Sequence, residues 1–124
     1  MLKHLSYLVL ILGFAACEPP QRNCSEFKEG TFEFTAMIKG EEKTTRFTRI
    51  ANLEVAEFEG VIDSSSVKWI NDCEYILKNL HPKNKSEEAP IVIKILTTSK
   101  DSYTFEYGVV GAAKKIRGTA KKTP

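Results

Sequence analysis

The sequence predicts an all-β domain: a single small antiparallel meander of seven or eight strands, forming a barrel or a sandwich after an N-terminal signal peptide. Most segments between residues 31 and 109 alternate apolar and polar residues with a period of two, which is typical of half-buried strands. Glycines, prolines and polar clusters interrupt these segments about every eight to twelve residues. No stretch keeps helical spacing over three turns. Since short turns join neighbouring segments, we expect an up-and-down order of strands.

The opening sixteen residues have the anatomy of a secretory signal. Lys3 and His4 precede an apolar run from Leu5 to Phe14, and small residues follow it. A helix that spans a bilayer needs roughly 20 apolar residues, so this run is too short for a permanent transmembrane anchor. We therefore expect residues 1–16 to be removed on export.

The end of this segment, Phe14-Ala15-Ala16-Cys17, resembles the bacterial lipobox, although leucine is commonest at the position of Phe14. The resemblance implies cleavage before Cys17 and attachment of a diacylglycerol, with palmitate-type acyl chains, to its sulfur. Residues 17–23 would then be a lipidated linker that tethers a β domain of residues 24–124 to a lipid bilayer. Because only Glu18 is acidic after the cysteine, we expect a periplasm-facing location. The alternative is an ordinary cleaved signal followed by a chance cysteine.

The two remaining cysteines, Cys24 and Cys73, form an even pair in an oxidising compartment, where disulfides persist. A bond between them would close a loop of about fifty residues and contribute ~4 kcal/mol in the chain-entropy model. The alternative is two separate thiols, with Cys73 buried as a small apolar side chain.

The first predicted strand, residues 31–38, places four apolar side chains on one face, and glycine punctuates both of its ends. Residues 44–50 form the second strand, with an imperfect alternation because Phe47 and Ile50 fall on opposite sides. A third strand follows at residues 53–58. Its apolar residues change register before Phe58, which predicts a β-bulge near Ala56.

The middle of the domain combines a weak segment and a strong one. Residues 61–65 are a weak strand or a loop, whereas residues 67–77 are dense in apolar and aromatic residues. Asn71-Asp72 within the second segment marks a turn or bulge between two short strands. Because the only tryptophan of the chain and Cys73 lie here, we expect this segment at the centre of the core.

The last third continues the pattern. Residues 79–90 form the longest loop, and strands follow at 91–96 and 103–109. The final strand is expected over residues 112–120 with its register unassigned, and residues 121–124 as a solvated tail.

Taken together, Cys24, residues 27–32 and the cluster Trp69-x-x-Asp72-Cys73-x-Tyr75 resemble a family of small lipoproteins from Bacteroidota-type bacteria. Some members carry a DNA topoisomerase IV label, but this chain has no room for an ATPase or DNA-gate domain and no Gly-Lys-Ser/Thr phosphate-binding motif. The resemblance implies the fold and the envelope location, and adds almost nothing on activity.

Composition and motifs indicate no catalytic residues, cofactor or metal. A formal net charge of +2 gives no basic footprint for nucleic acid. His81 lies in a predicted loop, without a partner to orient it as a base. Asp72 and Glu74 flank Cys73 and are best explained as solvent-facing groups or part of a turn. A basic end near the C-terminus could touch lipid headgroups or guard a strand edge. It comprises Lys114, Lys115, Arg117, Lys121 and Lys122.

Aromatic side chains of several strands could line a ligand cavity, although such residues more often fill a small barrel. The candidates are Trp69, Tyr75, Tyr103, Phe105 and Tyr107. We expect a membrane-anchored envelope lipoprotein that is not an enzyme but an interaction or structural module, with an envelope protein as its partner. The alternative is a calycin-like carrier of a small apolar ligand.

Overall fold

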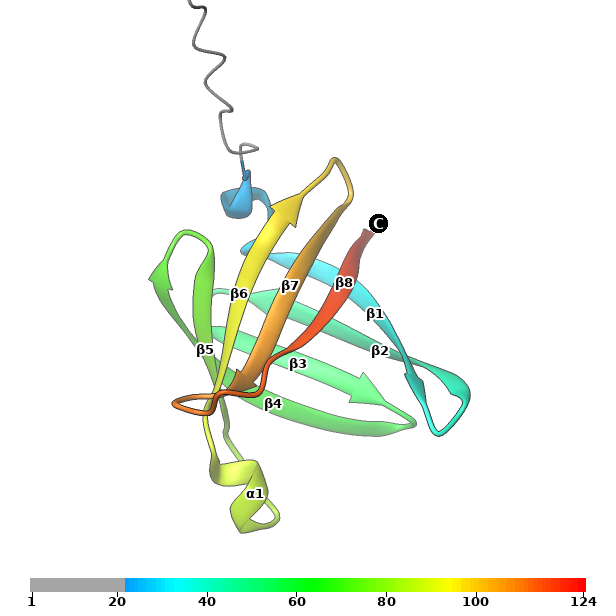
Figure 1. Ribbon diagram of the computed structural model, residues 1–124, viewed down its shortest axis with the longest axis vertical. Coiled ribbons are helices and arrows are strands. Elements are labelled where there is room, and N and C mark those ends of the chain that lie inside the picture. Colours follow the sequence, from blue (N-terminus) through cyan, green and yellow to red (C-terminus); the bar gives the residue numbers. More distant parts are fainter. Residues whose placement is uncertain (1–21) are drawn as a thin grey trace, which may run out of the picture.

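The computed structural model describes residues 22–124, which form a closed antiparallel barrel of eight strands (Figure 1). The strands follow one another in sequence order, and β1 closes the barrel against β8. This confirms the all-β meander and selects a barrel over a sandwich. The strands are β1 (Gly30–Ile38), β2 (Glu41–Ile50), β3 (Leu53–Phe58), β4 (Val61–Asn71), β5 (Glu74–Asn79), β6 (Ile91–Thr98), β7 (Ser102–Val109) and β8 (Ile116–Thr123). The signal segment and Cys17 lie outside the described residues.

The two ends of the barrel are built differently. A single 3₁₀ turn, η1 (Cys24–Phe27), lies across the end where β1 begins, and we call this the closed end. The opposite, open end carries two tight hairpin turns, the 80–90 loop with the one-turn helix α1 (Lys85–Glu88), and the 110–115 loop (Figure 1).

Both tight hairpins at the open end turn through two residues with positive φ. The φ angles are 51° and 79° at Lys39-Gly40, and 49° and 80° at Glu59-Gly60. This is the pattern of a type I′ turn, whose twist matches that of the flanking strands. Glycine stands second in both turns, where it adopts positive φ without steric cost.

The core fills the closed half of the barrel. η1 inserts Phe27, which is 1% exposed, between Phe32 of β1 and Tyr103 of β7, with ring centroids 6.4 and 5.2 Å away. Phe32 in turn stacks on Phe47 of β2 at 5.3 Å. Aromatic rings that bury large areas in such tilted and stacked pairs stabilise small cores.

The predicted bulge near Ala56 is wrong, because β3 pairs in unbroken register with both β2 and β4. The inward face of β3 carries Glu54 with Ala56 and Phe58 in strict alternation, whereas Leu53 is exposed. The sequence suggested a register change because a charged residue occupies an inward position. Register shifts occur instead between Trp69 and Asn71 and between Ile95 and Thr97.

Two other expected boundaries also change. Residues 61–65, expected as a weak strand or a loop, are a strand, and they continue without a break into the rest of β4, which is eleven residues long. The last strand, β8, begins at Ile116 rather than at residue 112, and it continues through the stretch that was expected to be a solvated tail. Lys121 and Lys122 pair with Glu33 and Phe32 of β1, so these residues close the barrel.

Candidate ligand-binding cavity

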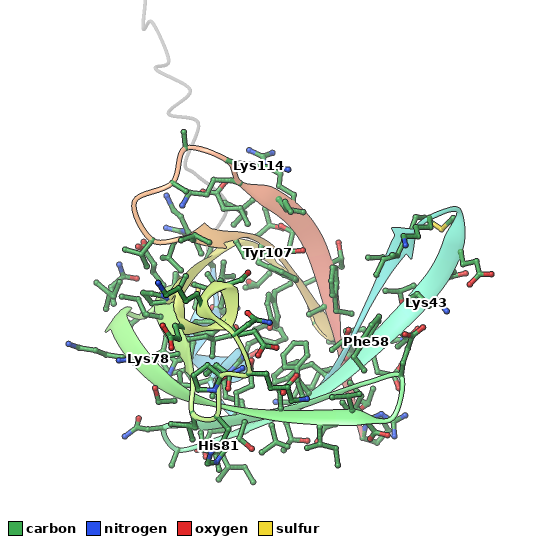
Figure 2. All side chains as sticks on the ribbon, turned by 90° about the horizontal axis from the view of Figure 1, so that it is seen from below. Lys43, Phe58, Lys78, His81, Tyr107 and Lys114 are labelled. Carbon is green, nitrogen blue, oxygen red and sulfur yellow. A yellow bond between two sulfur atoms is a disulfide. The ribbon has the colours of Figure 1, made fainter. Side chains whose placement is uncertain are left out.

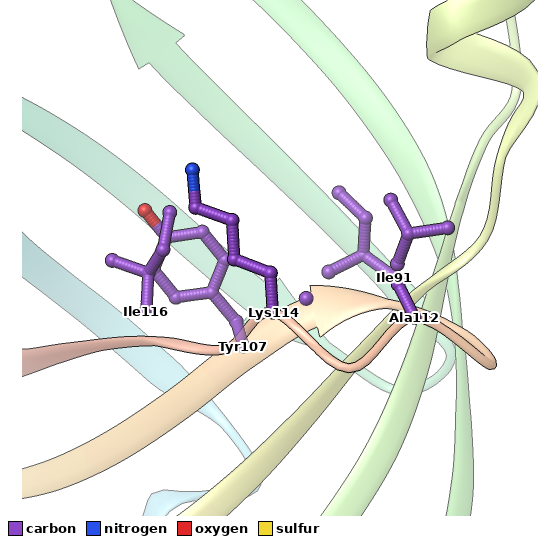
Figure 3. Close-up of a pocket in the computed structure, with 7 residues that line it drawn as sticks. Ile91, Tyr107, Ala112, Lys114 and Ile116 are labelled. Atoms are coloured by element: carbon purple, nitrogen blue, oxygen red, sulfur yellow. The ribbon is translucent and has the colours of Figure 1, made fainter.

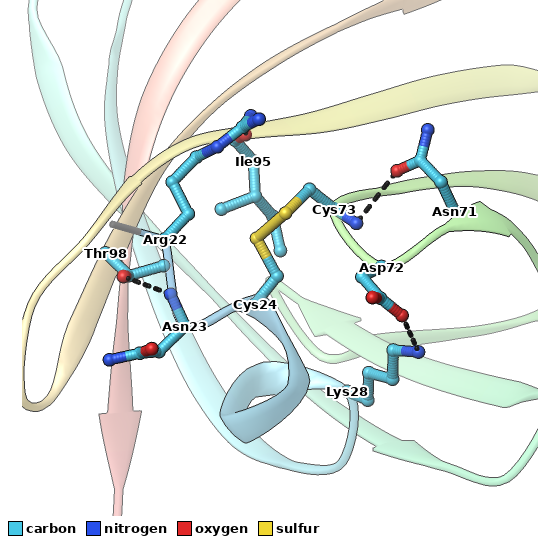
Figure 4. The surroundings of a disulfide bond; sticks show 9 residues. All are labelled: Arg22, Asn23, Cys24, Lys28, Asn71, Asp72, Cys73, Ile95 and Thr98. Atoms are coloured by element: carbon cyan, nitrogen blue, oxygen red, sulfur yellow. Dashed lines mark hydrogen bonds and ion pairs between the residues drawn. A yellow bond between two sulfur atoms is a disulfide. The ribbon is translucent and has the colours of Figure 1, made fainter. Parts of the chain in front are cut away.

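A disulfide between Cys24 and Cys73 ties η1 to the turn that precedes β5 (Figure 4). The two Cα atoms are 5.2 Å apart, and the predicted pairing is confirmed. The backbone at Cys73 is fixed on both sides: its N–H donates to Asn71 Oδ1 at 2.9 Å, and its carbonyl accepts from Ile95 N at 2.8 Å. η1, which we call the plug of the closed end, is therefore held by a covalent bond to a turn whose backbone is itself hydrogen-bonded.

The chain enters the barrel at this same end. Arg22 Nη1 donates to the carbonyl of Ile95 at 3.0 Å, and Asn23 N donates to Thr98 Oγ1 at 2.9 Å, so both lie against β6 (Figure 4). Lys28 forms an ion pair with the exposed Asp72 at 3.2 Å. These contacts place the N-terminal side of the described chain beside the closed end.

Arg49 of β2 lies fully buried beneath η1 and was not identified from the sequence. Its Nε donates to the carbonyl of Lys28 at 3.1 Å, and its Nη2 donates to the carbonyl of Phe27 at 2.5 Å. A guanidinium has five N–H donors, and a buried charge is tolerated only when these are satisfied. The backbone of the plug supplies two of the required acceptors.

Side chains supply the remaining acceptors for Arg49. Nη1 donates to Glu54 Oε1 at 2.9 Å and to the Tyr75 hydroxyl at 2.8 Å, while Nη2 lies 3.4 Å from the Tyr103 hydroxyl. The guanidinium also lies 4.7 Å from the ring centroid of Tyr75 and 4.8 Å from that of Phe32. All five donors are thus engaged inside the protein.

Burial dominates the ionisation of this cluster. Burial raises the pKa of Glu54, and the charge and hydrogen bond of Arg49 oppose that rise. Burial likewise raises the pKa of Tyr75 well above 10.0 and that of Tyr103 above 10.0, so both phenols stay protonated at neutral pH. For Arg49 burial favours the neutral form, but Tyr75, Tyr103 and Glu54 outweigh it and raise its pKa. The guanidinium therefore remains charged.

An apolar cavity of about 200 Å³, which we call the inner cavity, adjoins this cluster on the side of the open end. Of its ten lining residues, the only charged one is Glu54. The lining residues are Phe34, Phe47, Glu54, Tyr75, Leu77, Ile91, Ile93, Tyr103, Phe105 and Tyr107. The cavity therefore has apolar walls and a polar floor.

Four of the five aromatic residues that the sequence suggested as cavity lining do line it: Tyr75, Tyr103, Phe105 and Tyr107. Trp69 does not. It packs against Tyr75 with ring centroids 4.5 Å apart, and Lys28 Nζ lies 5.1 Å from its ring. Trp69 therefore supports the floor of the cavity from the closed end.

A second cavity of about 340 Å³, the outer cavity, lies at the open end and shares Ile91 and Tyr107 with the inner one (Figure 3). Lys114 is the only charged residue in its lining. Figure 2 views the barrel from this end and shows Tyr107 and Lys114 on one side, opposite His81. A Cβ at Gly108 would lie 2.5 Å from the carbonyl oxygen of Lys114, so glycine lets the 110–115 loop close over β7.

The other sequence candidates do not converge on a site. His81 and Asp72 are exposed and belong to different ends of the barrel. The predicted basic end is divided, because Lys114 and Lys115 precede β8 at the open end whereas Lys121 and Lys122 end it beside β1.

Within residues 22–124 no three His, Cys, Asp or Glu side chains are placed to hold a metal ion. The same range contains no helix that is long and apolar enough to cross a membrane.

Comparisons with family models, with curated proteins and with solved structures found no match to this chain.

Proposed function

We propose that this protein is a cell-envelope lipoprotein whose barrel binds a small, largely apolar molecule. The inner cavity carries the proposal, because it combines apolar walls with a few polar groups at one end. Ligand pockets commonly occupy about 300–1,000 Å³; the inner cavity alone is smaller, at about 200 Å³, but it adjoins the outer cavity of about 340 Å³. A pocket open to solvent leaves its apolar lining hydrated, so a purely structural module would gain from filling it. The open apolar lining therefore favours a carrier over the interaction or structural module expected first.

The anchor is proposed from the sequence, and the position of Arg22 supports one orientation of the barrel relative to it. Arg22 is bonded to β6 at the closed end. Cys17 precedes it by five residues, which span at most about 18 Å. A lipid on Cys17 would hold the closed end near the bilayer and direct the open end away from it, toward the periplasm or a partner protein.

Ligand binding can be tested with N-phenyl-1-naphthylamine, a neutral apolar probe whose fluorescence rises in apolar surroundings. We expect saturable binding of one probe per chain. Leu77→Trp fills the inner cavity and should abolish it. The control is Ile76→Trp, the neighbouring residue of β5, whose side chain points to the outside because successive strand residues alternate. Equal probe binding by both variants, or none by the wild type, contradicts the proposal.

Anchoring is tested separately in the native cell. Cys17→Ser should move the protein from membrane fractions to the soluble periplasmic fraction, because a serine cannot accept the thioether-linked lipid. Intact-mass analysis of the wild type should show a chain that begins at Cys17 and carries acyl mass. Retention of the Cys17→Ser variant in membranes would exclude the lipid anchor and leave the ligand proposal untouched.

A further inference from the structure

The floor of the inner cavity presents one carboxylate oxygen to whatever enters. Glu54 is 7% exposed, and its Oε1 accepts from Arg49 Nη1 at 2.9 Å. Its Oε2 accepts no hydrogen bond from residues 22–124. In this part of the chain every fully buried side-chain oxygen has a hydrogen-bond partner, so an oxygen without one is not fully buried. Oε2 is therefore accessible, and the accessible space beside Glu54 is the inner cavity that it lines.

The positive charge beneath the floor is not offered to a ligand. Arg49 donates its five N–H groups to two backbone carbonyls, to Glu54 and to the hydroxyls of Tyr75 and Tyr103. Arg49 also does not line the inner cavity. A ligand carboxylate would thus meet the Glu54 carboxylate without a cation in reach. In a medium of low dielectric constant such a pair of like charges is strongly unfavourable.

An added cation is disfavoured for the opposite reason. Arg49 and Glu54 already form a neutral pair, so an ammonium group bonded to Oε2 would bring a second buried positive charge close to the guanidinium. A neutral hydrogen-bond donor, such as a hydroxyl or an amide N–H, satisfies Oε2 and leaves the net charge of the floor unchanged.

We infer that the inner cavity selects neutral amphipathic molecules that enter with a hydrogen-bond donor first, and that it excludes fatty-acid-like anions. The donor bonds to Glu54 Oε2, and the apolar remainder lies against Phe34, Leu77 and Phe105 toward the open end. This assignment of ligand class rests on the proposed function. A hydrogen bond to a charged group is worth about 1.5–3 kcal/mol, which corresponds to about 10-fold to 100-fold in affinity.

Three ligands of one chain length test the inference on the wild-type protein: 1-octanol, 2-octanone and octanoate. The alcohol donates and accepts, the ketone only accepts, and the acid is an anion. Competition against N-phenyl-1-naphthylamine gives the affinities, and methyl NMR shifts of Ile91 and Ile93 locate the site. We expect 1-octanol to bind at least about 10-fold more tightly than 2-octanone, and octanoate to bind most weakly.

Glu54→Gln supplies the matching variant, because the amide can donate to a carbonyl oxygen. It should narrow or reverse the preference for alcohol over ketone. The control is Glu57→Gln, the same change on the outer face of β3, which should keep the wild-type preference. Circular dichroism checks that Glu54→Gln folds without its ion pair; if it does not, the wild-type ligand series decides alone.

The outcomes separate the inference from the proposed function. Equal affinity for 1-octanol and 2-octanone would overturn the inference and assign the polar contact to the tyrosine hydroxyls as donors. Tightest binding of octanoate would overturn it, because the carboxylate would then be held by a cation such as Lys114 of the outer cavity and not rejected at Glu54. Absence of binding by the probe and by all three ligands would overturn the proposed function and the inference together.

Discussion

The same eight strands enclose a packed interior at the closed end of the barrel and an apolar cavity toward the open end. At the closed end, η1, the disulfide and the Arg49 cluster fill the interior, and every donor of the guanidinium has an acceptor. At the open end the interior is an apolar cavity, and large apolar side chains are exposed around it. These exposed residues are Met37, Ile38, Val61, Ile62, Leu80, Val109, Val110 and Ile116. The packed, cross-linked core and the apolar cavities are therefore separated along the barrel axis.

The closed end is a set of mutually dependent contacts. Arg49 needs the carbonyls of Phe27 and Lys28, and these are in place only while η1 stays docked. The disulfide from Cys24 holds η1 against the turn at Cys73. Loss of one member should therefore weaken the others, whereas the open end should respond little.

The largest expected effect comes from Arg49→Met. It leaves the Glu54 carboxylate buried without its cation and two plug carbonyls without donors, which should cost about 3–5 kcal/mol. Urea unfolding followed by far-UV circular dichroism measures the change.

Arg46→Met is the matched control on the same strand. Arg46 pairs with Glu33 at 2.7 Å on the outer face, with its side chain 64% exposed, so its loss should cost about 0–1 kcal/mol. If the two variants lost equal stability, the buried cluster would not be the source of rigidity at the closed end.

The disulfide should have the next largest effect. Replacing both cysteines by serine removes the constraint on the unfolded chain and should lower the free energy of unfolding by about 2–4 kcal/mol. Because the inner cavity lies on the other side of the Arg49 cluster, probe affinity at low temperature should remain near that of the wild type.

Reduction provides the control for that experiment. Dithiothreitol should destabilise the wild type by a similar amount and leave the double variant unchanged. A loss of probe binding in the folded double variant would show that the two ends are coupled, and would break the separation described above.

Sequence alone could predict the antiparallel β-meander because its signals are local, whereas closure into a barrel rather than a sandwich came from the structure. Alternation, turn residues and the absence of helical spacing each depend on neighbouring residues, and they predicted seven or eight strands in up-and-down order, of which the structure has eight. The Cys24–Cys73 disulfide was expected because only two cysteines remain once Cys17 is assigned to the lipid, and because the compartment expected for an exported protein is oxidising. Four of the five proposed lining residues face the cavity, since β5 and β7 alternate regularly.

The polar floor could not be predicted in the same way. Arg49 lies two residues after Phe47, so strict alternation places it inside, but charged residues are almost never buried without partners. Its partners come from η1, β3, β5 and β7, which only the closed barrel brings together. The inward position of Glu54 also led to the mistaken prediction of a bulge near Ala56, because a charged residue is not expected inside a barrel without its partners.

The smallest effect separates two phenylalanines of β1. Phe32 is fully buried at the closed end, stacked on Phe47 at 5.3 Å and edge-on to Tyr103 at 5.6 Å. Phe34, two residues on, faces the same interior but lines the inner cavity. Phe32→Leu opens a void in packed surroundings and should cost about 1–2 kcal/mol, whereas Phe34→Leu enlarges an existing cavity and should cost about 0.5 kcal/mol.

Urea unfolding measures both variants, and probe binding supplies the second readout. Phe34→Leu should change probe affinity because it alters the wall of the cavity, and Phe32→Leu should not. Equal stability losses would indicate that the interior is packed alike along its length. In that case side chains would move in solution to fill the cavity. A cavity that collapses in this way no longer destabilises the protein, and it also no longer has room for a ligand.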